Sequence, residues 1–387
     1  MKISNVEAFV VGNPWKNWVL VKVTTDAGLV GWGDATTGLS TQPVTAAVRE
    51  LKRLCVGQDA LAIEALYDRV YKALYLTANG ILLSALGGIT TACWDILGKH
   101  ANLPLYQLLG GRVHAKLRAY ANGWYTGGRT PEAFAQGAQA VVARGYTALK
   151  FDPFGANYRF MSAAERRLSL SLVAAVREAV GDSVDLIIEA HDRFTAPEAI
   201  RLAHELQPYA PLGMEAAVWS EDVAALRRVA AASPIRILAG ERFCTPRQFD
   251  DLLADGHFDI VQPEYVELGG IARLRDVAGI AEAHGASLAP HNARCPISTA
   301  VNVHVMTATR NAFIQETFDD FHVPWAKELF AGVPQPRDGW FEASDRPGLG
   351  IEVNEALFDK HPYSEHFFMN LFAEGWEQRN AKPGSAH

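Results

Sequence analysis

Cysteine is scarce in this sequence, which has four in 387 residues: Cys55, Cys93, Cys244 and Cys295. None stands in the CxxC spacing that marks a zinc or redox motif, so the set does not indicate a metal or disulfide framework. We expect reduced, mostly buried small side chains.

An excess of positive charge is also missing, since the formal net charge is −7 and the pI is near 6.0. Nucleic acids and anionic membranes attract basic patches, and no run of Lys and Arg offsets this balance. The N-terminal stretch MKISNVEAFVVGNPWKNW lacks the apolar core of a signal peptide. No stretch approaches the ~20 apolar residues of a membrane span. We therefore expect a cytoplasmic protein without nucleic-acid or membrane partners.

The composition, with 49% hydrophobic and 20% charged residues, is that of a globular chain long enough for one large and one smaller domain. From about residue 117 onward, a short apolar run ending in polar residues alternates with an amphipathic stretch rich in Ala, Leu and Arg. One such stretch opens with Thr130 as N-cap and Pro131 at the first helical position. Eight strands are expected, at residues 117–124, 147–153, 184–191, 212–218, 235–242, 258–265, 286–292 and 311–317.

Alternation of strands and helices predicts a parallel sheet, either a closed βα barrel or a doubly wound open sheet. The polar strand ends recur at intervals of 26, 26, 23, 27 and 25 residues, one βα unit each: Glu189, Glu215, Glu241, Glu264, His291 and Glu316. A barrel brings all C-terminal strand ends to one mouth, whereas an open sheet spreads them along an edge. The pattern favours the barrel.

The regions on either side of the barrel have another character. Residues 1–116 combine alternating strands with three helical stretches, which predicts an α+β domain. The barrel is expected at 117–325. Residues 326–387 are irregular and rich in aromatics, and we expect them to pack on the first domain and complete it.

Three carboxylates on successive strands, Glu189, Glu215 and Glu241, would repel one another in one cavity unless a cation lies between them. Magnesium fits, because it takes oxygen ligands and keeps positions open for water or substrate. The alternative is that each carboxylate pairs with a nearby arginine, Arg193 for Glu189 and Arg242 for Glu241. Three acids in register favour the metal.

The next two strand ends carry Glu264 and His291, where a carboxylate can bond an imidazole and raise its basicity. The alternative is a structural histidine at the barrel rim. Lys150, Asp152 and Glu316 are expected to close the ring from the other side, with His191 facing His291 across the metal.

These strand ends resemble those of the enolase superfamily, mandelate racemase branch. The matching motifs run over nearly the whole chain: GWGDA, LKFDP, IIEAH, GERF, IVQPE, GGIARL, LAPHN and FIQET. The resemblance implies a modified barrel of the (β/α)7β kind with an α+β capping domain. Within the branch, YANGWY, TPEAF and IEAHDRF are most similar to acid-sugar dehydratases of the gluconate and galactonate type.

The resemblance implies roles for individual residues. Magnesium would be bound by Glu189, Glu215 and Glu241, and His291, oriented by Glu264, would take the C2 proton of a sugar acid. Further implied roles are a general acid that protonates the departing 3-hydroxyl and two groups that steady the enediolate: His191, Lys150 and a protonated Glu316. The product would be a 2-keto-3-deoxy acid.

Several positions depart from the branch. Glu189 and Glu264 stand where Asp is usual, and Ala216 and Ala217 replace the usual Glu-Pro after the second ligand. Racemases of the branch carry a lysine at the place of Asp152, so elimination is favoured over 1,1-proton transfer. The rival readings are a racemase, epimerase or cycloisomerase on the same scaffold, and a catalytically inactive binding barrel.

Substrate contacts are expected from capping-domain loops at 13–18 and 76–80 and from polar groups near the barrel mouth: Trp15, Trp18, Asn79, Asp152, Arg193, Asn292 and His322. The alternative for each is ordinary packing. The resemblance also implies a homo-oligomer, an octamer or a dimer.

Overall fold

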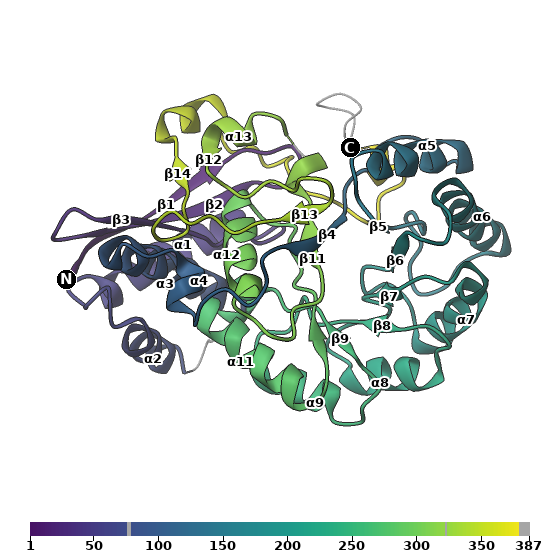
Figure 1. Ribbon diagram of the computed structural model, residues 1–387, viewed down its shortest axis with the longest axis horizontal. Coiled ribbons are helices and arrows are strands. Elements are labelled where there is room, and N and C mark those ends of the chain that lie inside the picture. Colours follow the sequence, from purple (N-terminus) through teal and green to yellow (C-terminus); the bar gives the residue numbers. More distant parts are fainter. Residues whose placement is uncertain (76–78, 322, 379–387) are drawn as a thin grey trace.

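The computed structural model describes residues 1–75, 79–321 and 323–378, and Figure 1 shows a capping domain beside a barrel. The alternating N-terminal residues form an antiparallel sheet in the order β1-β2-β3, as the sequence predicts. Its strands are β1 (Ile3–Val11), β2 (Trp18–Thr25) and β3 (Val30–Asp34). Helices α1 (Thr41–Cys55), α2 (Ile63–Ala73) and α3 (Gly80–Ala101) follow.

Helix α3 packs closely on β3 because two strand glycines leave room for its backbone. A Cβ added to Gly33 would lie 2.0 Å from the carbonyl oxygen of Gly88. Among the described residues, α3 is the one helix long and apolar enough to cross a membrane, although the sequence did not lead us to expect such a stretch. Because 72% of its most apolar window is buried inside the protein, its side chains form the core of the capping domain.

The eight predicted strands all form, in the predicted order and within the predicted ranges. They are β4 (Leu117–Ala121), β5 (Ala148–Phe151), β6 (Asp185–Glu189), β7 (Gly213–Glu215), β8 (Ile237–Leu238), β9 (Ile260–Val261), β10 (Ser287–Leu288) and β11 (Gln315–Thr317). The ring is parallel from β11 through β4 to β8, and single bridges from Ala239 to Val261 and from Leu288 to Ala312 join β9 and β10 to it. The barrel is confirmed, and the open sheet is excluded.

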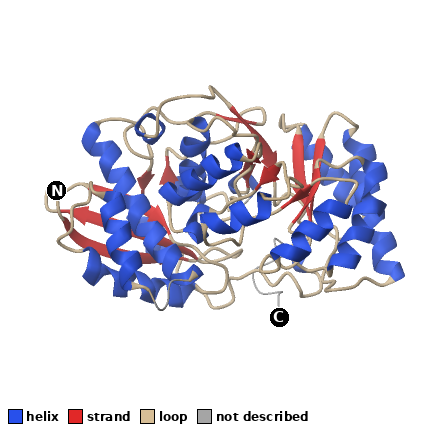
Figure 2. Cartoon of the chain, turned by 90° about the horizontal axis from the view of Figure 1, so that it is seen from below, coloured by secondary structure: helices blue, strands red, loops and turns tan. Residues whose placement is uncertain are grey.

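Helices cover the outside of this ring (Figure 2). They are α5 (Pro131–Val142), α6 (Ala163–Val180), α7 (Ala196–Leu206), α8 (Val223–Ala232), α9 (Pro246–Leu253), α10 (Tyr265–Leu268), α11 (Ile271–Ala283) and α12 (Pro296–Thr307). The hydroxyl of Thr130 accepts a hydrogen bond from the Ala133 amide, and Pro131 opens α5, as predicted. Because the described residues after β11 form no such helix, the barrel is of the (β/α)7β kind.

Short elements complete the chain. They are α4 (Leu105–Leu108), α13 (Ala326–Leu329), β12 (Phe330–Ala331), β13 (Trp340–Phe341), β14 (Glu352–Val353), and the 3-10 turns η1 (Gln207–Tyr209), η2 (Asp319–Phe321), η3 (Glu355–Lys360) and η4 (Trp376–Gln378). Strand β13 pairs with β4, and β12 pairs with β14.

The C-terminal segment contacts both domains. Phe330 and Phe358 pack on the rings of Trp18 and Phe9, which holds the segment on the capping sheet. The chain then crosses to the barrel, where residues 366–378 form what we call the strap. The centre of the Trp376 ring lies 6.2 Å from that of the Tyr125 ring. In Figure 1 the yellow end of the ribbon runs beside α5. The segment therefore also packs on the barrel, a contact that the sequence did not suggest.

Candidate active site

A polar layer lies directly above the apolar layer that fills the barrel. Ile187 belongs to the interior core, and Glu189, two residues on, points to the same side because strand side chains alternate. The same offset of two residues relates Ala148 to Lys150, Ile260 to Gln262, Ala289 to His291 and Ile314 to Glu316. The strand ends therefore line one mouth, as the spacing predicts.

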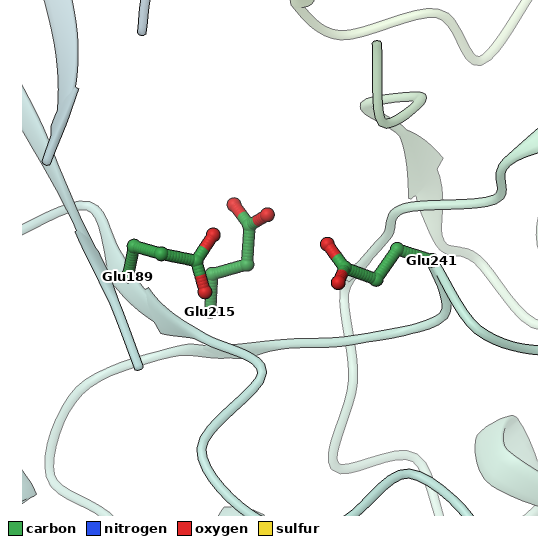
Figure 3. A group of neighbouring side chains, drawn as sticks. All are labelled: Glu189, Glu215 and Glu241. Carbon is green, nitrogen blue, oxygen red and sulfur yellow. The ribbon is translucent and has the colours of Figure 1, made fainter. Parts of the chain in front are cut away.

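Three carboxylates meet in this layer. Figure 3 shows Glu189, Glu215 and Glu241 directed toward a shared space, and one oxygen from each lies within 4.8 Å of the others. Glu189 and Glu215 are almost fully buried. The cluster predicted from the 26-residue steps is therefore present.

Lys150 supplies positive charge to this cluster. Its Nζ lies 2.5 Å from Glu215 Oε1, 2.9 Å from Glu316 Oε1 and 3.2 Å from Glu189 Oε2. Burial lowers the pKa of Lys150, but Glu215 and Glu316 outweigh that effect and raise it well above its usual value. Lys150 is therefore held as an ammonium.

One ammonium does not satisfy three carboxylates. Burial and the neighbouring carboxylates raise the pKa of Glu189 to about 7 and that of Glu215 well above its usual value. Oε2 of Glu241 is buried and accepts no hydrogen bond among the described residues. A set of carboxylate oxygens that lacks positive charge fits a hard divalent cation.

The arginine alternative is wrong for both acids. Arg193 pairs with Asp152, at 2.6 Å between Nη2 and Oδ2, and not with Glu189. Arg242 pairs with Asp192, at 3.3 Å, and not with Glu241.

His291 is held by a carboxylate and an arginine. Its Nδ1 lies 2.9 Å from Glu264 Oε2, which also accepts from Arg294 Nε at 3.1 Å, so the longer Glu264 side chain does reach the ring. Its Nε2 lies 3.5 Å from Glu241 Oε2. Burial opposes protonation of this ring, but Glu241, Glu316 and Glu264 prevail and raise the pKa of His291 to about 9.

His191 has the same kind of support. Its Nδ1 lies 2.7 Å from Asp152 Oδ2, and Arg193 binds the same oxygen. Burial raises the pKa of Asp152, but Arg193 and His191 outweigh it and bring it below its usual value. His191 and Asp192 have positive φ angles of 48° and 57°, a strained backbone at the end of β6. This turn lets the His191 amide donate to Glu189 Oε1 at 2.7 Å.

Glu316 differs from expectation. It accepts hydrogen bonds from the Asn122 side chain, at 2.8 Å, and from the Asn292 amide, at 2.6 Å, besides its contact with Lys150. Burial raises its pKa, but Lys150 and His291 outweigh burial and lower it. The expected protonated Glu316 is therefore corrected to an ionised carboxylate.

The polar layer opens into a cavity of about 430 Å³. Of the predicted site residues, those that line it are Trp15, Lys150, Glu189, His191, Glu241 and His291. The cavity is also lined by residues that were not predicted as site residues: Lys16, Asn122, Arg294 and, from the strap, Phe368, Met369 and Leu371. Lys16 lies inside the loop 13–18, which was predicted to contact the substrate. Asn122 follows the inward-facing Tyr120 by two residues, the same offset that places the other polar side chains at the mouth, so the sequence also indicated its position. The strap residues show no such pattern in the sequence.

Other predicted substrate contacts do not line the cavity. Asp152, Arg193 and Asn292 are fully buried and bind other protein groups. Trp18 packs on Trp325, and the Asn79 side chain caps α3 by accepting from the Leu82 amide. In the structure these residues have protein partners, and the expectation that they contact a substrate stays a prediction. Residues 76–78 and His322 lie outside the described residues.

Comparisons with known proteins agree with this geometry. Residues 10–110 match the family model "Mandelate racemase / muconate lactonizing enzyme, N-terminal domain", and residues 133–357 match "Enolase C-terminal domain-like". The chain is 36% identical to a D-gluconate dehydratase of Thermoproteus tenax, over 90% of this chain and 70% of that protein. It is 34% identical to a D-gluconate/D-galactonate dehydratase of Picrophilus torridus, over 97% of each.

Solved structures are similar over the whole fold. The crystal structure of a mandelate racemase/muconate lactonizing enzyme from Jannaschia superimposes with a TM-score of 0.87 and 34% identity, covering 94% of this chain and 98% of that one.

Proposed function

The chain belongs to the enolase superfamily, in the mandelate racemase/muconate lactonizing enzyme branch, and from that premise we propose that it is a magnesium-dependent sugar-acid dehydratase, a hydro-lyase. Relatives named as gluconate and galactonate dehydratases support an aldonic acid as substrate. The observation that carries the proposal is the Glu189, Glu215 and Glu241 cluster between two supported histidines.

The metal site would consist of the three clustered carboxylates. Magnesium bound there supplies Lewis acidity, which makes a proton next to a carboxylate acidic enough to remove. Lys150, an ammonium on the floor of the cavity, stabilises negative charge on the substrate oxygens. Glu316 holds Lys150 and the Asn122 amide in place, and contributes through them rather than by donating a proton.

The two histidines act on opposite sides of the substrate. His191 follows β6 and His291 follows β10, and these strands lie four places apart in the eight-stranded ring. His291, oriented by Glu264, removes the C2 proton with Nε2, which faces the cluster. His191, oriented by Asp152, donates a proton from its other nitrogen to the departing 3-hydroxyl. The enol that remains becomes a 2-keto-3-deoxy acid.

A racemase or epimerase is the second candidate, and one observation favours it. Each histidine has a buried carboxylate on Nδ1 and an arginine on that carboxylate, so the His191 ring is held in the same way as the His291 ring. Such a pair can remove a proton from one face and return it to the other. Loss of water distinguishes the two reactions, since epimerisation keeps the mass.

The test is incubation of the purified protein with magnesium and a panel of aldonic and aldaric acids, with 2-keto-3-deoxy products scored by semicarbazide. His291→Asn is expected to abolish C2 proton exchange with deuterium from solvent. His191→Asn is expected to stop dehydration while exchange continues. His284→Asn is the matched control, because His284 also binds a carboxylate, Asp250 at 2.9 Å, but outside the cavity.

Two results would contradict these roles. Exchange that persists in His291→Asn removes that residue as the base, and dehydration near the wild-type rate in His191→Asn removes it as the acid. A product of unchanged mass supports epimerisation.

A further inference from the structure

Lys16 is a buried basic residue in the cavity wall that has no partner in the part of the chain that the structure describes. It lies in the capping-domain loop between β1 and β2, its exposed fraction is 8%, and it lines the cavity beside Trp15. Among the described residues, its ammonium has no hydrogen bond and no ion pair. A buried charge without a partner is costly, so a charge of opposite sign is expected to meet it.

The other cations of the cavity already have partners. Lys150 contacts three carboxylates. Arg294 binds Glu264 and also Glu267, whose Oε1 lies 2.7 Å from its Nη2. Lys16 differs from both.

Lys16 stays charged at neutral pH although its surroundings lower its pKa. Burial and the nearby Arg294 lower its pKa to about 8, while Glu264, Glu241 and Asp34 act in the opposite direction from a distance. Asp34 is engaged elsewhere, because its Oδ2 accepts from the Ser298 hydroxyl at 2.6 Å and its Oδ1 accepts from the Thr36 amide. The protein therefore leaves the partner of Lys16 to a ligand.

The position of Lys16 indicates which part of a ligand it meets. This step rests on the proposed function, in which one carboxylate of the substrate lies at the strand ends with Glu189, Glu215 and Glu241. Because Lys16 comes from the capping domain and not from a barrel strand, we infer that it meets the opposite end of the substrate. An aldonic acid carries only hydroxyl groups there, and these do not neutralise an ammonium.

We propose that Lys16 binds a second anionic group at the far end of the substrate, so that the preferred substrates are sugar diacids of the aldaric type or sugar acids with a terminal phosphate. The carboxylate and the phosphate share the chemistry that Lys16 recognises, a compact anion with several acceptor oxygens. The cavity of about 430 Å³ is within the range of small-ligand sites. The dehydration chemistry is unchanged, but the preferred substrate carries a second anionic group that a plain aldonic acid lacks.

The test compares matched pairs of compounds with magnesium present: galactarate with galactonate, and 6-phosphogluconate with gluconate. The wild-type protein is expected to have a kcat/KM about 10-fold or more higher for at least one anion-ended member than for its partner. Lys16→Met, which keeps the length and removes the charge, is expected to lower that value roughly 10- to 100-fold, the range of a charge-assisted hydrogen bond. It should change the values for galactonate and gluconate by less than about 3-fold. A preference within the galactarate pair indicates that Lys16 binds a carboxylate, and a preference within the 6-phosphogluconate pair indicates that it binds a phosphate.

Two further variants serve as controls. Lys16→Arg keeps the charge and is expected to retain most of the preference. Lys72→Met removes an exposed lysine of the same domain, paired with Asp68 on α2, and is expected to change nothing. Equal losses for both members of a pair in Lys16→Met, or a wild-type preference for the compounds with one acid group, would overturn the proposal.

Binding separates this proposal from the proposed reaction. Titration calorimetry of the same compounds with the magnesium-loaded protein measures affinity whether or not turnover occurs. If no dehydration is found but the anion-ended compounds bind more tightly and Lys16→Met removes the difference, the reaction is wrong and the Lys16 site stands. If none of the compounds binds to the wild-type protein, the Lys16 site is refuted.

Discussion

Replacing Asp152 by asparagine tests how His191 is positioned. The change keeps the side-chain shape but removes the negative charge that lies 2.7 Å from His191 Nδ1 and 2.6 Å from Arg193 Nη2. A hydrogen bond to a charged group contributes about 1.5–3 kcal/mol. If that energy orients His191 during loss of the hydroxyl, dehydration falls roughly 10- to 100-fold, at about 1.4 kcal/mol per tenfold change.

The same change also affects stability, because Arg193 becomes a buried charge without its carboxylate. Breaking a buried pair costs about 3–5 kcal/mol, which corresponds to roughly 5 °C in Tm for a chain of this length. Rates are therefore compared well below the Tm of the variant.

The informative measurement is the ratio of two rates on one sample, C2 proton exchange in deuterated solvent and release of the 2-keto-3-deoxy product. Asp152→Asn is expected to lower the rate of product release and to leave the rate of C2 proton exchange within about 3-fold of the wild-type value. Asp185→Asn is the matched control, since it breaks an Asp–Arg pair with Arg118 at the other end of the neighbouring strand. If exchange and dehydration fall together, or if neither changes, Asp152 does not act through His191.

Three further predictions concern stability. Burial lowers the pKa of His304 to about 4, against about 6.5 in an unfolded chain, so the stability it confers is present above pH 6.5 and is lost as pH falls to 4. The free energy of unfolding is expected to fall by about 3 kcal/mol over that window, at 1.36 kcal/mol per pKa unit. Chemical unfolding of His304→Gln should show a smaller fall in this free energy between pH 6.5 and pH 4. The same fall as in the wild type would show that His304 is not its cause. Magnesium at about 100 times its Kd is expected to raise Tm by about 3 °C, and Glu215→Gln should abolish the rise. The same rise in that variant would place the ion elsewhere. Gly33→Ala is expected to destabilise the capping domain by about 3 kcal/mol, since its Cβ would meet the Gly88 carbonyl, whereas Gly279→Ala in α11, with open space around its Cβ, should gain about 1 kcal/mol; equal denaturation midpoints would contradict this.

The barrel and the acids at its strand ends were predictable because two local periods specify them. Side chains alternate along a strand, and one βα unit separates equivalent positions, so Glu189 and Glu215 follow from counting. Counting fails where strands end. Asp152 stands two residues after Lys150 and should point inward, but β5 ends at Phe151, and the Asp152 side chain turns to accept from the Phe154 amide and to contact His191.

The remaining site residues depend on long-range packing. Arg193 follows two residues with positive φ, a conformation that sequence alone gives no reason to expect at His191 and Asp192. Lys16 was within a predicted contact loop, yet nothing local showed that its ammonium would be buried without a partner. The strap has neither helical nor strand period, so its place against the barrel follows only from the tertiary fold.

The strap has a consequence for how the protein is made. The cavity wall includes Trp15 and Leu371, which are far apart along the chain, and Trp376 lies edge-on to the His191 ring at 5.9 Å. Domains tend to fold in order as the chain leaves the ribosome, so the barrel can close while its last wall is still unsynthesised. A nascent or prematurely terminated chain would then be folded yet catalytically incomplete. Activity is therefore expected only once translation has passed the strap.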